Sequence, residues 1–231
     1  MSHQELLSPE GFRYDGRRCN EQRNFSLELN THPHAADGSA ICSMGNTKVL
    51  SLLRGPTDSN DSGLSLSVSI IQPPYAKSDR VQVSKNDRRF AELSLMVQRT
   101  LLQSIVQKAY PRTNINIKLT ILSADGSILA ACVNSATAAL VDAGIALYDT
   151  VTAITVGIHD ISPLIDCNAI EEIDLPYLTI GTISNSKINL LLMESKTPLD
   201  KLQKMINLGT EGCIQIRNQL DIAIRKSAIK H

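Results

Sequence analysis

The sequence predicts an α+β fold in which a mixed β-sheet carries helices packed on it. Two patterns lead to this fold class. In the first part of the chain, apolar and polar residues alternate, which is the two-residue period of half-buried strands. From about Arg88, apolar residues recur every three or four positions, which is the period of amphipathic helices. The resulting order is four strands, helix, strand, helix, three strands, helix, and it fits mixed sheets with helices on one face.

The first four strands are separated by short turns. An alternating segment at 25–29 marks the first strand, and Asp-Gly and Gly-Asn turns bracket the next two, at 39–44 and 47–54. A polar loop at 59–63 precedes a fourth alternating segment at 64–70.

Helices and strands then alternate to the end of the chain. The first helix begins near Arg88, with Asn86 or Asp87 as its N-cap, and ends before Pro111. Gly144 caps an Ala-rich second helix, and the last helix starts around Pro198. Between them we expect strands at 115–121, 151–158, 177–183 and 188–194. No linker of low complexity and no repeat interrupts the chain, so we expect a single domain over residues 1–231.

The composition excludes several classes of protein. The 23 basic and 23 acidic residues give a formal net charge of zero, which argues against a free-standing nucleic-acid binder. Aromatic residues make up only 3% of the chain, too few for base-stacking platforms. The five cysteines form no C-x-x-C pair, so we expect reduced core thiols in an intracellular protein. No run is long and apolar enough for a signal or a membrane span, so we expect no membrane association.

The strand–turn–helix segment at 114–144 is the first candidate site. A glycine-containing turn that opens a helix offers free N–H groups to an anion. A working phosphate site normally adds a hydroxyl group and a cation. Here Gly126 is followed by Ser127, Ile128 and Leu129, of which only Ser127 can bond an anion. On these residues alone, an ordinary helix start in the core is the simpler interpretation.

Two charged segments are weaker candidates. Carboxylates gather between Asp166 and Asp174, where they could hold Mg²⁺ or supply an acid, although solvated loop charge is the commoner explanation. Five cations lie at 77–89, and two arginines in a first helical turn oppose the helix dipole, which suggests a phosphate-backbone contact. The alternative for this segment is a solvated charged loop. His32 and His34 have no third ligand nearby in sequence, so we expect neither a metal nor a cofactor.

Seven stretches, taken together, resemble one family. In order, they are SPEGFRYDGRR (8–18), HAADGSA (34–40), GNTKV (45–49), DRR (87–89), YPRT (110–113), ADG (124–126) and VDAGI (141–145). Their order and spacing resemble the RNase PH family nearly end to end, and within it the exosome ring subunits whose archaeal counterpart is catalytic. The resemblance implies the RNase PH-like fold, also described as ribosomal protein S5 domain 2-like.

The resemblance also implies which residues to compare with active relatives, which are phosphorolytic 3′-to-5′ exoribonucleases. Their phosphate-binding hydroxyl residue and arginine fall on Ile128 and Leu129, so phosphate binding is expected to be lost. Asp166 matches one of two acidic positions, and Glu172 stands where an aspartate is usual, so both are expected to be remnants. The RNA-lining arginine pair falls on Arg88 and Arg89.

The expected function is therefore that of a non-catalytic exosome ring subunit. By resemblance, its partners are other RNase PH-like subunits in a six-membered ring, RNA-binding cap subunits, a docked hydrolytic exoribonuclease and single-stranded RNA. The RNA-binding candidates, taken with the basic segment, are Arg80, Lys85, Arg88 and Arg89. Such a protein would serve RNA processing and decay in the nucleus, including the nucleolus, and in the cytoplasm.

Two alternatives remain open at the level of the sequence. One is an active phosphorolytic exoribonuclease that binds phosphate through Ser127 and the backbone amides of residues 126–129. The other is an unrelated small-molecule enzyme on a similar fold, which would need a closed pocket of convergent polar groups.

Overall fold

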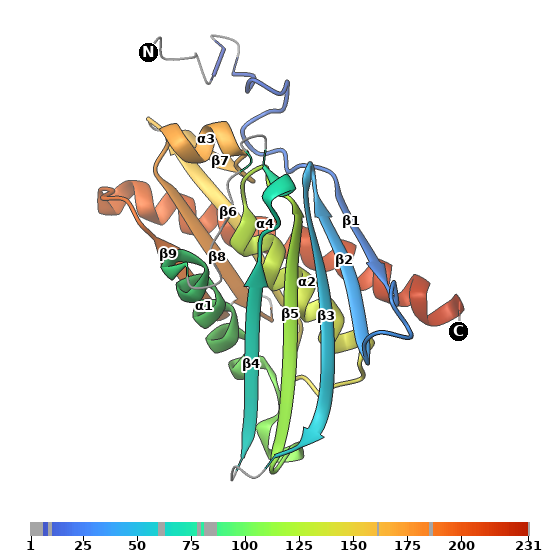
Figure 1. Ribbon diagram of the computed structural model, residues 1–231. Coiled ribbons are helices and arrows are strands. Elements are labelled where there is room, and N and C mark those ends of the chain that lie inside the picture. Colours follow the sequence, from blue (N-terminus) through green and yellow to red (C-terminus); the bar gives the residue numbers. More distant parts are fainter. Residues whose placement is uncertain are drawn as a thin grey trace.

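The structure is a computed structural model that describes residues 7–8, 11–59, 63–77, 80, 87–160, 162–184 and 187–230. Within these residues, nine strands form two sheets, and four α-helices pack between and beside them (Figure 1). The α+β class with a mixed sheet and packed helices is confirmed.

The first sheet has five strands in the order β1-β2-β3-β5-β4. β4 runs parallel to β5, while the other neighbours are antiparallel, so the sheet is mixed. β1 and β4 are its two edges. In chain order the strands are β1 (Phe25–Leu29), β2 (Gly38–Met44), β3 (Thr47–Asp58), β4 (Leu64–Ile71) and β5 (Thr113–Ser123).

The second sheet has four antiparallel strands in the order β7-β6-β8-β9. They are β6 (Val151–His159), β7 (Ser162–Ile165), β8 (Tyr177–Ile183) and β9 (Lys187–Met193). β7 and the short helix α3 (Ala169–Asp174) were not predicted. Both are only four to six residues long, and a segment of that length is too short to display a clear hydrophobic period.

The helix α2 (Ile128–Asp142) lies between the two sheets and packs against β2, β3 and β6 (Figure 1). Every residue from Leu129 to Leu140 is buried, as expected for a largely apolar helix that is enclosed between two sheets. Its many alanines let both sheets approach closely, so one continuous hydrophobic cluster includes residues of both sheets.

The other long helices cover the outside. α1 (Arg88–Ser104) packs against β4 and β9, and α4 (Leu199–Lys230) packs against β6, β8 and β1 (Figure 1). Of the two N-cap candidates, Asp87 caps α1 through its side chain, which accepts a hydrogen bond from Arg89 N, while Asn86 lies outside the described residues. Two 3₁₀ turns, η1 (Pro74–Ala76) and η2 (Gln107–Ala109), complete the elements.

All five cysteines are free thiols, and four of them are buried. In the part of the chain that the structure describes, no helix is long and apolar enough to cross a membrane.

Candidate functional site

The turn at Gly126 and Ser127 joins β5 to α2. Gly126 has a φ angle of +76° and Ser127 one of +53°, so both lie in the left-handed region. A Cβ atom on Gly126 would stand 2.5 Å from the backbone carbon of Asn168, which leaves room only for glycine. The turn is therefore pressed against the segment that carries the acidic residues.

Ser127 is committed to contacts inside the protein. Its hydroxyl lies 3.1 Å from Asp166 Oδ1 and 3.0 Å from the carbonyl oxygen of Cys167, so it donates within the core. Its backbone N–H donates to Glu172 Oε1 at 2.6 Å. A carboxylate of the chain itself thus binds the amide of Ser127, the N-cap residue of the helix, at the helix end that favours anions.

The two residues after Ser127 present apolar surface. Leu129 is buried and belongs to the core cluster, while Ile128 is half-buried and packs against it. Both line a cavity of about 300 Å³ between α1, α2 and the second sheet. Helix geometry leaves the N–H groups of Ile128, Leu129 and Ala130 without intrahelical acceptors.

Asp166 is the central acceptor of this region and is 1% exposed. It forms an ion pair with Arg23, whose Nη2 lies 2.6 Å from Oδ1, and it also accepts from the backbone N–H of Arg23 at 2.9 Å. Arg23 Nη1 in turn donates to the carbonyl oxygen of Asp125 at 2.5 Å. One arginine therefore joins the turn before α2 to the acidic segment.

The explanation of the acidic segment as solvated loop charge is wrong for its central residues. Glu171 is buried and paired with Arg13, which also donates to the carbonyl oxygens of Ile165 and Asp166. Glu171 further completes a capping box with Asn168 at the start of α3. These carboxylates are buried because arginines from residues 13–23 reach across to pair with them, a long-range contact that spacing alone does not reveal.

The two candidate acids are shifted in opposite directions. Burial alone would raise the pKa of Asp166, but the hydrogen bonds and charge of Arg23 outweigh it and hold that pKa below its usual value. Burial also raises the pKa of Glu172, and there the amide of Ser127 and the charges of Arg23 and Arg89 do not compensate fully. Asp166 is thus a stable anion, while Glu172 is the more easily protonated. Their status as remnants of a catalytic pair stays a prediction.

The cavity beside α2 combines an apolar wall with a charged rim. Residues from α1, α2, β6, β8, β9 and the neighbouring segments line it: Gln72, Lys77, Asp87, Arg89, Phe90, Leu93, Ile128, Leu129, Thr155, Glu172, Tyr177, Thr179, Leu192 and Glu194. Burial, together with the charges of Glu194 and Glu172, raises the pKa of Tyr177, so its phenol stays protonated. The only described cations on this lining are Lys77 and Arg89, and both lie away from the turn in sequence.

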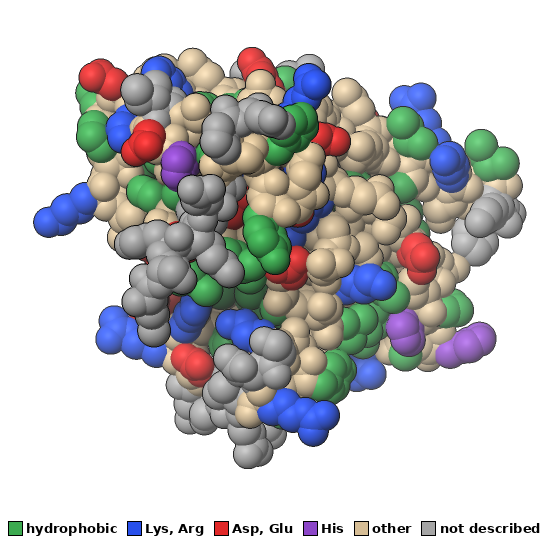
Figure 2. Space-filling view, turned by 90° about the horizontal axis from the view of Figure 1, so that it is seen from above, with side chains coloured by type: hydrophobic (Ala, Val, Ile, Leu, Met, Phe, Trp, Pro, Cys, Tyr) green, Lys and Arg blue, Asp and Glu red, His purple; other side chains and the backbone are tan. Residues whose placement is uncertain are grey.

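The two arginines at the start of α1, Arg88 and Arg89, lie in different environments. Arg89 lines the cavity, whereas the side chain of Arg88 is 91% exposed and pairs with Glu92. Arg80 is exposed, and Lys85 lies outside the described residues. Figure 2 shows Lys and Arg side chains interspersed with Asp and Glu on the face that it presents, in keeping with the zero net charge. RNA binding by these four residues stays a prediction.

Sequence reasoning missed Arg13 and Arg23, the partners of the buried acids, as well as Tyr177 and Glu194 on the cavity wall. The one available signal for Arg13 was its position in the N-terminal stretch 8–18 that resembles the family, and Arg23 lies just beyond that stretch. His32 is exposed and lies beside Thr31, and within the described residues no group of His, Cys, Asp and Glu could hold a metal ion.

Comparisons with known proteins agree on the family. Residues 21–146 match the 3′ exoribonuclease family, domain 1, and residues 149–212 match its domain 2. The exosome complex component SKI6 of Saccharomyces cerevisiae is 40% identical to this chain, covering 100% of it and 97% of that protein. The human exosome complex component RRP41 is 31% identical, covering 98% of this chain and 96% of that protein. The single-domain organisation stays a prediction.

Solved structures show the same fold. The crystal structure of rice (Oryza sativa) Rrp46 superposes with a TM-score of 0.82 at 25% identity, over 92% of this chain and 100% of that one. The Archaeoglobus fulgidus exosome with RNA bound to the active site gives a TM-score of 0.78 at 20% identity, over 91% of this chain and 93% of that one.

Proposed function

The chain belongs to the 3′ exoribonuclease (RNase PH) family, and from that premise we propose that it is a ring subunit of an RNA exosome that conducts RNA without cleaving it. The relatives that cover its full length are named exosome complex components, which supports the assembly. Its partners would be other RNase PH-like subunits in a six-membered ring, RNA-binding caps and a docked hydrolytic exoribonuclease. The protein would work in the nucleus, including the nucleolus, and in the cytoplasm.

The observation that carries the non-catalytic part of the proposal is the start of α2. An inorganic phosphate there would meet the aliphatic side chains of Ile128 and Leu129 and the carboxylate of Glu172, which already accepts the Ser127 amide. Losing a charge-assisted hydrogen bond costs about 1.5–3 kcal/mol, and placing an anion against apolar surface costs more. The added repulsion from Glu172 makes phosphate binding still less favourable.

This observation also weakens the active alternative. An enzyme that uses Ser127 and nearby amides would have to displace Glu172 from the Ser127 N–H and free a hydroxyl that is bonded inside the core. The amides of Ile128 and Leu129 would remain, but the residues that follow Ser127 supply no cation, and Arg89 on the same cavity lining belongs to α1.

The first experiment measures phosphorolysis by the assembled ring. We expect no nucleoside diphosphate from single-stranded RNA in the presence of phosphate. Asp166→Ala is a poor control because it breaks the buried pair with Arg23. Ile128→Asp is better, since Ile128 is only half-buried and the new carboxylate would repel phosphate. Nucleoside diphosphate release that Ile128→Asp in this subunit abolishes would overturn the proposal.

The second experiment tests the RNA path. Arg88→Glu with Arg89→Glu should weaken RNA binding by the ring while assembly stays intact, because both cations can contact backbone phosphates. The slope of log K against log salt concentration should become shallower by about 1.4, or about 0.7 per contact to single-stranded RNA. Arg99→Glu on the same helix is the matched control, since Arg99 is exposed but does not line the cavity. Equal effects of the double variant and the control would sink the assignment of the RNA path.

A further inference from the structure

The edge strand β1 has a free outer side. Among the residues that the structure describes, its only partner strand is β2, in a regular antiparallel register from Phe25↔Met44 to Leu29↔Ala40. The carbonyl oxygen of Asn24 and the amide of Asn30 both bond toward β2. Because successive residues of a strand direct their N–H and C=O groups to opposite sides, the backbone groups of Phe25, Leu27 and Leu29 point to the open edge.

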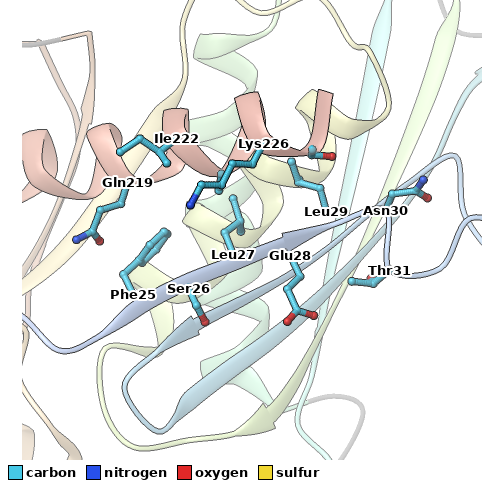
Figure 3. Close-up of a pocket in the computed structure, with 12 residues that line it drawn as sticks. Phe25, Ser26, Leu27, Glu28, Leu29, Asn30, Thr31, Gln219, Ile222 and Lys226 are labelled. Carbon is cyan, nitrogen blue, oxygen red and sulfur yellow. The ribbon is translucent and has the colours of Figure 1, made fainter. Parts of the chain in front are cut away.

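The same three residues turn their side chains toward α4. Figure 3 shows Phe25, Leu27 and Leu29 on the side of β1 that faces the helix, with Ser26 and Glu28 on the opposite side. Between β1 and α4 lies a groove of about 860 Å³, larger than the cavity beside α2. Its helix wall consists of one face of α4, formed by Gln219, Ile222, Ala223, Lys226 and Ser227.

The groove lies beside β1, the edge strand of the first sheet, and is open where a further strand could follow. The helix wall is about 12 Å long and β1 about 17 Å, so an added strand of about five residues would fit beside β1. Ile222 is 53% exposed although it lies on the groove-facing side of α4. A strand placed there would cover this apolar surface and satisfy the outward backbone groups at the same time.

The edge lacks several of the devices that hinder strand addition. Soluble proteins protect edge strands with short length, charged side chains, especially lysine, proline, bulges or a covering element, and of these β1 has only its short length and Glu28. β1 has the sequence FSLEL, with no lysine or proline and no shift in register. The opposite edge, β4, is covered by α1, whose Gln98 donates to the carbonyl oxygen of Leu66 at 2.7 Å. This weakly protected edge is therefore consistent with a surface that another chain covers.

We propose that an extended segment of a neighbouring subunit adds to β1 as a further strand and fills the groove against α4. Among the described residues that line the groove, the charged ones are Glu28 and Lys226. They lie on opposite faces of the added strand, so the segment carries apolar residues and one acidic residue toward α4, and a basic residue on the side of Glu28. This inference rests on the proposed function, since the neighbour is a subunit of the ring.

Residue-resolved hydrogen exchange tests the strand addition, with the isolated chain compared with the assembled ring. The amides of Phe25, Leu27 and Leu29 should exchange at least about tenfold more slowly in the ring, while those of Ser26 and Glu28, already bonded to β2, should change little. An intact ring in which the three amides exchange as in the isolated chain overturns the inference alone. A chain that joins no ring overturns both the inference and the proposed function.

Variants of α4 test the occupant. Ile222→Asp and Lys226→Glu should each abolish the ring-dependent protection of the three amides, whereas Ile229→Asp and Arg225→Glu, exposed positions on the same helix outside the groove, should preserve it. A photo-crosslinker at position 222 should label an alternating apolar segment of a different subunit. Labelling of β1 in a second copy of this chain, or unchanged protection in both groove variants, would overturn the proposal.

Discussion

At the scale of single residues, Asp166 connects three parts of the chain. Its carboxylate accepts from the amide and guanidinium of Arg23 and lies beside the hydroxyl of Ser127, so the N-terminal segment, the turn before α2 and the acidic segment meet at one charge. A buried ion pair of this kind is costly to break, because the remaining partner stays charged and out of water. A structural role of this kind accounts for the presence of Asp166 without any catalysis.

Removing the Asp166 carboxylate should therefore destabilise the fold. We expect Asp166→Ala to lower the free energy of unfolding by about 3–5 kcal/mol, since it leaves Arg23 buried without its partner. Asp15→Ala is the matched control, because it removes an ion pair with Arg17 that is partly exposed, and it should cost about 1 kcal/mol or less. Urea unfolding of both variants measures the difference. Similar losses for the two variants would show that the buried pair is not special.

The same carboxylate should make stability depend on pH. The folded-state pKa of Asp166 is lowered, so its contribution is fully present above the unfolded value of about 3.9 and is lost as the pH falls through the lower folded pKa. Glu172 works in the opposite direction, because its raised pKa means that protonation at low pH relieves a cost. We expect Asp166→Asn to flatten the acid limb of a plot of unfolding free energy against pH. An acid limb as steep as that of the wild type would contradict this assignment.

At the scale of secondary structure, α2 determines how the two sheets meet. Its small residues are buried on every side, between β2 and β3 on one sheet and β6 on the other. The side chain of Asn134 connects the helix to the second sheet, where it donates to the carbonyl oxygen of Ala153 and accepts from its amide. Close packing on both sides leaves little room for larger residues.

Enlarging a small residue of α2 should therefore cost stability. Ala136→Leu should destabilise the fold by about 1–3 kcal/mol, because the added atoms force the sheets apart. Ala228→Leu on the exposed side of α4 is the control and should change stability by less than about 0.5 kcal/mol. Thermal or urea unfolding measures both, and equal stabilities would refute the tight packing around α2.

The elements that the sequence predicts are those with a long hydrophobic period. The alternating segments correspond to β1 to β6, β8 and β9, and the segments with a helical period correspond to α1, α2 and α4. Sheet order could not be predicted, because β4 reaches its place beside β5 only through the parallel crossover formed by α1. At the site, the aliphatic residues after Ser127 were visible in the sequence. The hydrogen bond from the Ser127 amide to Glu172 could not be seen in the sequence, because it joins residues 45 positions apart.

At the scale of the whole molecule, a chain with zero net charge attracts RNA little by itself. In an assembly, the attraction comes from the cations of several subunits together. A ring subunit does not need a basic excess of its own, because a channel sums the cations that each subunit presents. In the proposed function, Arg89 on the cavity rim and Arg88 in solvent would contact RNA phosphates without distinguishing bases. In that function, the RNA passes without phosphorolysis, because Glu172 already occupies the Ser127 amide in the turn before α2.

Calorimetric titration of inorganic phosphate into the RNA-bound ring tests most directly whether the turn at Gly126 and Ser127 excludes phosphate. Other subunits can bind phosphate too, so the decisive comparison is between the ring with the natural chain and the ring with Ile128→Asp in this chain. We expect identical titrations, because phosphate does not enter the turn beside Ile128 and Leu129. A saturable binding heat that disappears with Ile128→Asp would mean that this chain holds phosphate, and the claim of a silent subunit would be wrong.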